Sequence, residues 1–221
     1  MIVINKYKSL IFDCDGVILN SNKIKSDAFR KVLTKFNQNA VNEFITYHKA
    51  NGGISRYVKF EYFLNNILPR YEKIKINKEL LLKQFLEKYS SECKLLLCKS
   101  EVTKNLKELR IISGTIPWLI VSGGDQNELI EVFKYKKINS YFNGGIYGSP
   151  DKKNIIVQRA IMNRTIKFPA LMFGDSKLDY DVAKANDIDF IFVTQWTDLK
   201  DYKPYCIENA IKTINSVSEI I

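Results

Sequence analysis

Four short apolar runs restrict the fold of this chain more than any other feature of its sequence. They cover residues 10–12, 118–121, 170–173 and 190–193, and each leads into polar or glycine-containing sequence. Between them, apolar residues recur at helical spacing, for example over 129–133 and 155–161. Strands that are apolar throughout are buried on both faces, as in parallel sheets whose connections are helices. The pattern predicts an α/β fold with a doubly wound parallel sheet.

The stretch between the first two apolar runs has a different pattern. Within residues 23–100 we recognise no strand, whereas apolar residues repeat at helical spacing in three segments. Gly52-Gly53 and Pro69 mark breaks between these helices. The sequence therefore predicts an all-helical domain of residues 23–100, inserted into a core made of residues 1–22 and 101–221.

The composition is that of a soluble globular protein. The 221 residues suffice for one large domain or for a domain with an insert, and the contents of 46% hydrophobic and 26% charged residues are ordinary. No apolar run approaches the roughly 20 residues that span a bilayer. The first residues also lack the apolar stretch and cleavage site of a signal peptide. We therefore expect a cytoplasmic location and no membrane as a partner.

The net charge of +10 and the four cysteines bear on the ligands of the protein. The lysines are spread along the chain rather than gathered in one run with aromatic residues, which argues against nucleic acid as a partner. A basic surface still attracts small anions. Cys14, Cys93, Cys98 and Cys206 form no C-x-x-C pair and there is one histidine, so we expect neither a zinc site nor a disulfide framework. No sequence feature indicates an oligomeric state.

Polar residues with complementary chemistry stand where the predicted strands end. They are Asp13 and Asp15 after the first run, Ser122 and Gly123 after the second, the pair Lys152-Lys153 before a helix, and Asp175 and Asp179 after the third run. Each group alone has a structural explanation, such as a turn, a helix cap or a solvated pair. Because ligands of doubly wound sheets bind at the carboxyl ends of the strands, their joint occurrence favours one site.

Phosphoryl transfer needs this set of groups. The transferred phosphoryl group carries charge on three oxygens, which cations and hydrogen-bond donors stabilise. Several carboxylates in one cleft repel one another unless a divalent cation joins them, and hard oxygen ligands suit Mg²⁺. Of the first two aspartates, one can attack or hold metal while the other moves protons. Gly16 permits a sharp turn directly after them.

These motifs resemble those of the haloacid dehalogenase superfamily of phosphatases, in the branch of β-phosphoglucomutase and phosphoglycolate phosphatase. That family carries Asp-x-Asp, a strand ending in Ser or Thr, a lysine before a helix, and Gly-Asp-x-x-x-Asp. The insert occupies the position of a helical cap domain. The resemblance implies a Rossmann-like core and phosphoester chemistry, because family members with other reactions lack the second aspartate.

The resemblance also implies individual roles. Asp13 would be the nucleophile that forms an aspartyl-phosphate, and Asp15 the general acid and base. Mg²⁺ would be bound by Asp13, Asp175 and the main-chain carbonyl of Asp15, while Asp179 would support the metal-bound waters and the lysine. Ser122 and Gly123 would hold the phosphoryl group. The spacing Gly-Ser-Pro-x-x-Lys selects Lys153 as the functional lysine, with Lys152 as the alternative.

The insert gives the indications about the substrate. Its Gly-x-Ser-Arg element, which ends at Arg56, resembles a cap element whose arginine reaches a distal anionic group of the substrate; the alternative is that Ser55 caps a helix and leaves Arg56 exposed. A helical cap excludes macromolecules, which favours a small sugar or polyol phosphate, as in phosphatases of bacterial surface-polysaccharide synthesis.

Hydrolysis is the favoured reaction, and a phosphosugar mutase like β-phosphoglucomutase is the alternative. Those mutases carry a histidine about ten residues beyond the second aspartate, where this chain has Lys25. We expect the one histidine, His48, on the surface of a helix. A non-catalytic binding domain and a phosphatase of nucleic acids are disfavoured, by the complete set of charged residues and by the helical insert respectively.

Overall fold

A parallel six-stranded sheet forms the centre of the protein in a computed structural model that describes residues 4–73 and 77–220. The strand order is β3-β2-β1-β4-β5-β6. The strands are β1 (Ser9–Phe12), β2 (Trp118–Asp125), β3 (Gly145–Ser149), β4 (Ala170–Gly174), β5 (Asp189–Val193) and β6 (Lys212–Ile214). The four predicted runs are the four central strands, which confirms the predicted α/β class. The two edge strands, β3 and β6, were not predicted, because they are partly exposed and carry no continuous apolar run.

The strand register brings the predicted polar residues to one edge of the sheet. Phe12 of β1 pairs with Ile120 of β2 on one side and with Phe173 of β4 on the other. The segments that follow these three strands therefore lie side by side at their carboxyl ends. In the strand order, β2 and β3 lie on one side of β1, whereas β4, β5 and β6 lie on the other side, so the order reverses next to β1. Sheets of this kind bind ligands at the carboxyl ends of the strands beside such a reversal.

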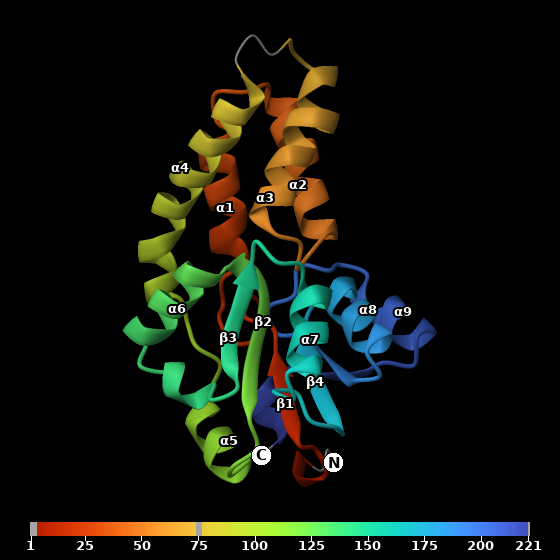
Figure 1. The fold of residues 1–221 in the computed structure, drawn as a ribbon. Coiled ribbons are helices and arrows are strands. Elements are labelled where there is room, and N and C mark those ends of the chain that lie inside the picture. Colours follow the sequence, from red (N-terminus) through yellow and green to blue (C-terminus); the bar gives the residue numbers. More distant parts are fainter. Residues whose placement is uncertain (1–3, 74–76, 221) are drawn as a thin grey trace.

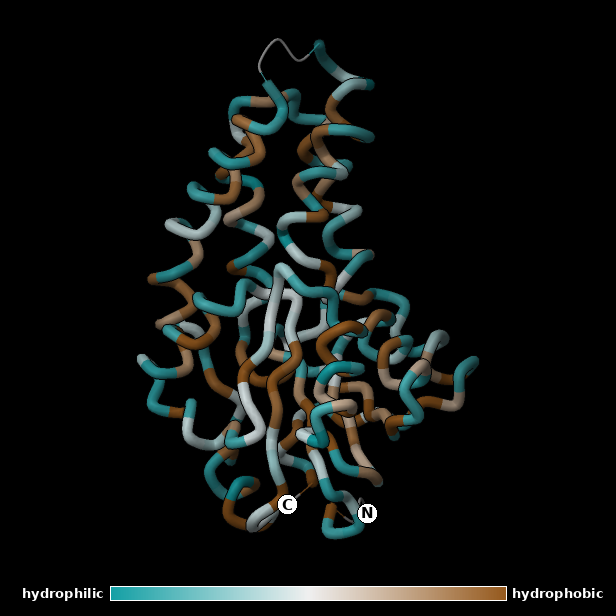
Figure 2. The backbone as a smooth tube through the Cα atoms, in the orientation of Figure 1, coloured by the Kyte–Doolittle hydropathy of each residue, from teal (hydrophilic) through white to brown (hydrophobic). Residues whose placement is uncertain are grey.

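Helices cover both faces of the sheet (Figure 1). Leu10 and Phe12 pack on the face with α6 (Gln126–Tyr135), whereas Ile11 packs on the opposite face with α7 (Lys153–Met162) and α8 (Lys177–Ala185). Alternate residues of a strand point to opposite faces, so a strand between two helical layers must be apolar throughout. Figure 2 shows these hydrophobic strands at the centre of the molecule. The remaining helices of this part are α5 (Leu106–Ile112) and α9 (Tyr202–Glu208).

The predicted insert is a group of helices that stands on the carboxyl edge of the sheet (Figure 1). Its helices are α1 (Asn22–Val32), α2 (Gln38–Ala50), α3 (Arg56–Tyr62) and α4 (Lys78–Lys99). After α3 the chain continues through a π-helical turn and a 3-10 turn that contains Pro69. Edge-to-face contacts of Phe29 with Phe44 and Phe60 lie at the centre of the group. Over the described residues the insert contains no strand, which confirms its all-helical prediction.

None of the helices in the described part of the chain is long and apolar enough to cross a membrane.

Candidate active site

The end of β1 is shaped by Gly16. Its φ of +80° lies in the left-handed region, and a Cβ atom there would lie 2.0 Å from Oδ2 of Asp175. Only glycine therefore permits both the turn and the close approach of the segment after β4. The main-chain N–H of Cys14 donates to Oδ1 of Asp13 at 2.7 Å, and the Cys14 side chain is fully buried. The turn fixes the Asp13 carboxylate at the sheet edge.

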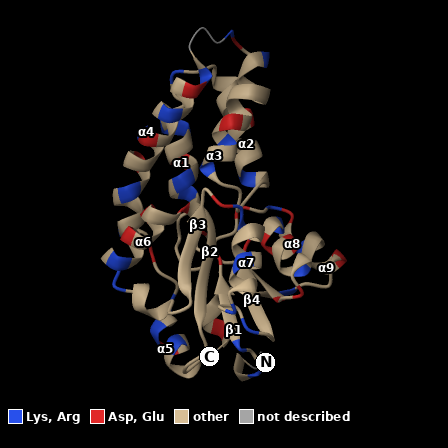
Figure 3. Cartoon of the chain, viewed as in Figure 1, with Lys and Arg blue, Asp and Glu red and all other residues tan. Residues whose placement is uncertain are grey.

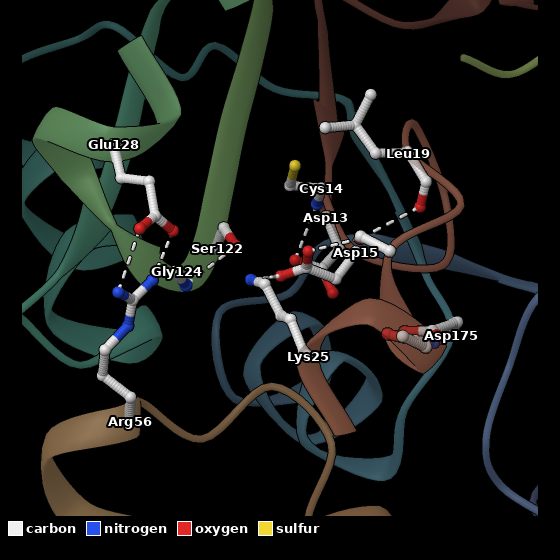
Figure 4. Close-up of polar contacts among 12 residues, drawn as sticks. Asp13, Cys14, Asp15, Leu19, Lys25, Arg56, Ser122, Gly124, Glu128 and Asp175 are labelled. Atoms are coloured by element: carbon white, nitrogen blue, oxygen red, sulfur yellow. Dashed lines mark hydrogen bonds and ion pairs between the residues drawn. The ribbon is translucent and has the colours of Figure 1, made fainter. Parts of the chain in front are cut away.

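Three buried carboxylates meet beside this turn. One oxygen from each of Asp13, Asp175 and Asp179 lies within 4.8 Å of the other two. Burial raises the pKa of Asp13 to about 7, and burial followed by repulsion from Asp13 raises the pKa of Asp175 well above its usual range. Figure 4 shows Asp175 facing Asp13 and Asp15. Ionisation of these buried carboxyls is unfavourable without a nearby positive charge, so the cluster is a candidate site for a divalent cation.

Lys153 lies between two members of this cluster. Its Nζ is 2.9 Å from Oδ1 of Asp13 and 2.5 Å from Oδ1 of Asp179. Burial opposes the charge of the lysine, but the two carboxylates outweigh it and raise its pKa. The neighbouring Lys152 is exposed and precedes the first turn of α7. Of the two lysines considered from the sequence, Lys153 is the one that the fold brings to the cluster.

Both carboxylate oxygens of Asp179 accept hydrogen bonds from neighbouring side chains. While Oδ1 accepts from Lys153, Oδ2 accepts from Oγ of Ser176 at 2.6 Å, and the side chain is fully buried. Ser176 in turn caps α8, because its Oγ accepts from the N–H of Asp179. Asp179 is therefore placed to position Lys153.

Asp15 is held in its ionised form. Its carboxylate accepts from Oγ of Ser21 at 2.6 Å and from Nζ of Lys25, with which it forms a buried ion pair (Figure 4). Burial alone would raise the pKa of Asp15, but the charge of Lys25 and these two hydrogen bonds outweigh it and lower the pKa. Among the described residues, no N–H donates to the main-chain carbonyl of Asp15, which leaves this oxygen available. Sequence reasoning missed this role of Ser21 and Lys25.

Ser122 and Gly123 close the site at the end of β2. The buried Ser122 Oγ accepts from the N–H of Gly124 at 3.0 Å, so its own hydrogen is available to donate. A Cβ atom at Gly123 would lie 2.1 Å from the carbonyl oxygen of Gly53, in the loop between α2 and α3. Glycine at position 123 thus lets the insert lie directly on the end of β2.

A cavity of about 350 Å³ lies between the sheet edge and the insert. The sheet side contributes acidic and glycine residues, and the insert contributes basic residues and aromatic rings. The cavity lining includes Asp13, Asp15, Gly123 and Asp175 from the sheet side and Lys25, His48, Arg56 and Lys59 from the insert. A cavity of this size holds a small molecule.

Arg56 is buried, which contradicts the alternative prediction that it is exposed. Only 4% of its side chain is accessible, and the guanidinium forms a two-pronged ion pair with Glu128 of α6. It also donates to Oγ of Ser90 at 2.9 Å and lies 4.6 Å from the ring centre of Tyr89. Ser55 does cap α3, but Glu128 supplies the countercharge that lets the arginine lie inside.

His48 is also buried, and its predicted place on a helix surface is wrong. Its Nε2 lies 3.0 Å from Oγ of Ser26 in α1, and its Nδ1 lies 2.9 Å from Nζ of Lys59 in α3. The ring packs on Phe29 at 4.7 Å between centres. The face of α2 that carries His48 is covered by α1 and α3, a packing that helical periodicity alone does not reveal.

Comparison with known families agrees with this geometry. Residues 10–193 match the family of haloacid dehalogenase-like hydrolases. The chain belongs to this family. The match runs from β1 to β5 and thus includes the helical insert and all the site residues described above. No curated protein sequence matches the chain significantly.

Solved structures of three bacterial proteins share the fold over nearly the whole chain. A predicted phosphatase from Clostridium acetobutylicum has 18% identity and a TM-score of 0.71, covering 97% of this chain and 96% of that one. A family member from Streptococcus pneumoniae has 18% identity, a TM-score of 0.68 and 97% coverage of both chains. β-Phosphoglucomutase from Clostridium difficile has 19% identity and a TM-score of 0.70, covering 97% of this chain and 93% of that one. At these identities the likeness is one of fold.

Proposed function

We propose that this haloacid dehalogenase-like hydrolase is a Mg²⁺-dependent phosphomonoesterase that acts through an aspartyl-phosphate on Asp13. The observation that carries the proposal is the position of Asp13. Its carboxylate lines the cavity, lies 2.9 Å from the charged Lys153 and shares a cluster with Asp175. A carboxylate nucleophile needs a neighbouring cation to orient it and to receive the negative phosphoryl group.

The side chains divide the reaction between them. Asp13 attacks phosphorus and the bond to the substrate oxygen breaks. Lys25 and Ser21 hold Asp15 ionised in the free enzyme, so Asp15 must first take up a proton from solvent, which it then gives to the leaving alkoxide. Asp15 then takes a proton from the water that attacks the aspartyl-phosphate, which releases phosphate and restores Asp13. The hydroxyl of Ser122 and the N–H groups near Gly123 hold the phosphoryl oxygens. The bonds from Lys25 and Ser21 favour the ionised Asp15 that the second step requires.

The oxygen atoms at this edge fit Mg²⁺. The carboxylates of Asp13 and Asp175 and the main-chain carbonyl of Asp15 would hold it, because these are hard ligands and none of the described N–H groups occupies that carbonyl. When bound, Mg²⁺ supplies positive charge beside the phosphoryl oxygens. Asp179 is less suited as a ligand because both of its oxygens already accept hydrogen bonds.

Mg²⁺ is expected to raise the melting temperature, and to raise it more at about pH 8 than at about pH 6. The pKa of Asp13 is raised to about 7 and that of Asp175 is raised as well, so both carboxyls bind protons more tightly in the folded chain than in the unfolded one. As the pH rises through this window their ionisation destabilises the folded state, and a bound cation relieves that loss. Thermal denaturation with and without Mg²⁺ measures the difference. Equal shifts at both pH values, or an undiminished shift in Asp175→Asn, would contradict the assigned site.

A small sugar or polyol phosphate is the substrate class that we propose, as in polysaccharide precursor synthesis, with the enzyme in the cytoplasm. The cavity of about 350 Å³ between insert and core supports a small substrate over nucleic acid. A phosphosugar mutase is the second candidate, because the fold of β-phosphoglucomutase is similar.

A screen of sugar, polyol and nucleotide monophosphates with p-nitrophenyl phosphate as the general probe tests this proposal. We expect Mg²⁺-dependent release of one phosphate per substrate consumed. Isomerisation of a sugar phosphate without net release of phosphate, dependent on a sugar bisphosphate, would establish the mutase instead.

A further inference from the structure

The helical insert carries almost all of the net charge of the protein. Residues 23–100 contain sixteen Lys and Arg against seven Asp and Glu, so that the insert accounts for +9 of the total of +10. Figure 3 shows basic residues along α1 and α4. A positive field on the side that covers the cavity raises the local concentration of anions.

Most cations that line the cavity are neutralised by a carboxylate. The pairs are Lys25 with Asp15, Arg56 with Glu128, Lys49 with Asp198 and Lys177 with Asp201. Lys59 is the exception: no carboxylate oxygen of the described residues lies within 4.0 Å of its Nζ, although its side chain lines the same cavity. The cavity therefore contains one buried amine that lacks a countercharge in this part of the chain.

The contacts of Lys59 leave room for a ligand. Only 3% of the residue is accessible, and its Nζ donates to Nδ1 of His48 at 2.9 Å and to the His48 carbonyl at 3.4 Å. An ammonium group has three N–H bonds, so one remains. His48 supplies no countercharge, because an imidazole ring is either neutral or cationic. Burial and the charge of Lys59 lower the pKa of His48 well below its usual range and keep the ring neutral, so that its Nδ1 can accept from Lys59.

Burial without a countercharge makes the Lys59 ammonium costly. Burial first, and then repulsion by Lys25 and Lys153, lower the pKa of Lys59 to about 7, against the weaker attraction of Asp15 and Asp198. An anion beside Nζ would supply both the missing charge and the missing acceptor. Since Lys59 lines the cavity into which Asp13 opens, such an anion would belong to the molecule that is dephosphorylated.

We propose that Lys59, oriented by His48, binds a second anionic group of the substrate, a carboxylate or a second phosphate. This inference rests on the proposed phosphatase function and narrows its substrate to phosphoesters with two anionic groups. Lys59 is thus a specificity residue, and it takes no part in the chemical step at Asp13.

Steady-state kinetics with two matched series of substrates test the inference. The six-carbon series is glucose 6-phosphate, 6-phosphogluconate and glucose 1,6-bisphosphate. The three-carbon series is propyl phosphate, 3-(phosphonooxy)propanoate and propane-1,3-diol bisphosphate. For at least one substrate with a second anionic group, we expect kcat/KM to be about tenfold higher than for the substrate of the same series that carries a single phosphate. Preference for the carboxylate or for the phosphate identifies which anion the site takes.

Lys59→Met is expected to remove this preference by raising KM about tenfold for the doubly anionic substrate, while kcat stays within about twofold. Lys49→Met is the matched control, because Lys49 also lines the cavity but has Asp198 as its partner, and it is expected to keep the preference. Loss of the uncompensated cation should leave the melting temperature of Lys59→Met unchanged or higher.

A wild-type enzyme that hydrolyses p-nitrophenyl phosphate and all the probes without preference for a second anion would overturn the inference and leave the proposed function intact. A lower kcat with unchanged KM in Lys59→Met would also overturn it. Failure to hydrolyse any probe would overturn the proposed function and the inference together.

Discussion

Asp13→Asn is expected to abolish phosphate release, with kcat lower by about 10⁴-fold or more. The substitution keeps the shape of the side chain but replaces a charged oxygen nucleophile with a neutral amide, which cannot form the aspartyl-phosphate. The fold should persist, because Lys153 keeps its contact with Asp179. Burial already raises the pKa of Asp13 to about 7, so loss of its charge should not lower the melting temperature without Mg²⁺. Release of p-nitrophenol measures the activity.

Asp181→Asn is a matched control for this prediction. Asp181 lines the same cavity and undergoes the same chemical change, but it lies outside the cluster of Asp13, Asp175 and Asp179. We expect it to keep kcat within about twofold of the wild type. If Asp13→Asn kept more than about a tenth of the activity, another group would have to be the nucleophile.

Arg56→Met is expected to destabilise the protein by about 3–5 kcal/mol. The side chains of Arg56 and Glu128 are only 4% and 8% accessible, and their ion pair joins α3 of the insert to α6 of the core. Removing the arginine leaves a buried carboxylate without its partner, which is far less favourable than removing both charges. The double variant Arg56→Met/Glu128→Leu should therefore recover most of the lost stability. Urea denaturation followed by circular dichroism measures the free energies of unfolding.

An exposed ion pair between the same two parts of the molecule provides the control. Lys94 of α4 lies 2.8 Å from Glu131 of α6, and both side chains are more than half exposed. Because solvent screens such pairs, Lys94→Met should lower the free energy of unfolding far less than Arg56→Met does. A similarly small effect of Arg56→Met would show that the buried pair does not stabilise the contact between insert and core.

The central strands could be predicted because a strand that is buried on both faces appears in the sequence as a continuous apolar run. Strands such as β1 and β4 lie between two helical layers, are buried at every position and consist mostly of apolar residues. At the edge of the sheet this constraint relaxes. Two of the five residues of β3 are glycines and three are partly exposed, so no apolar run marks the strand.

In the candidate site, too, some residues could be predicted from the sequence and others could not. Asp13, Ser122 and Asp175 could be proposed from the sequence because each follows directly on a recognisable strand, and the register of a parallel sheet brings such positions together. The partners Lys25 and Glu128 could not be proposed, because their contacts depend on how helices of the insert pack. Glu128 is 72 residues from Arg56, and only the position of α3 beside α6 in the folded chain brings the two together.

The most direct test of the mechanism is to trap the phosphorylated enzyme. In Asp15→Asn, Asp13 should still attack the phosphorus of p-nitrophenyl phosphate, because p-nitrophenolate leaves without a proton from an acid. The variant lacks the base that activates water, so the aspartyl-phosphate should accumulate. After an acid quench, borohydride reduces an acyl phosphate to an alcohol, which converts the modified aspartate into homoserine. Peptide mass spectrometry should then find homoserine at position 13. Homoserine at position 175 or 179 instead, or release of the substrate alcohol with Asp13 unmodified, would contradict the role of Asp13 as the nucleophile.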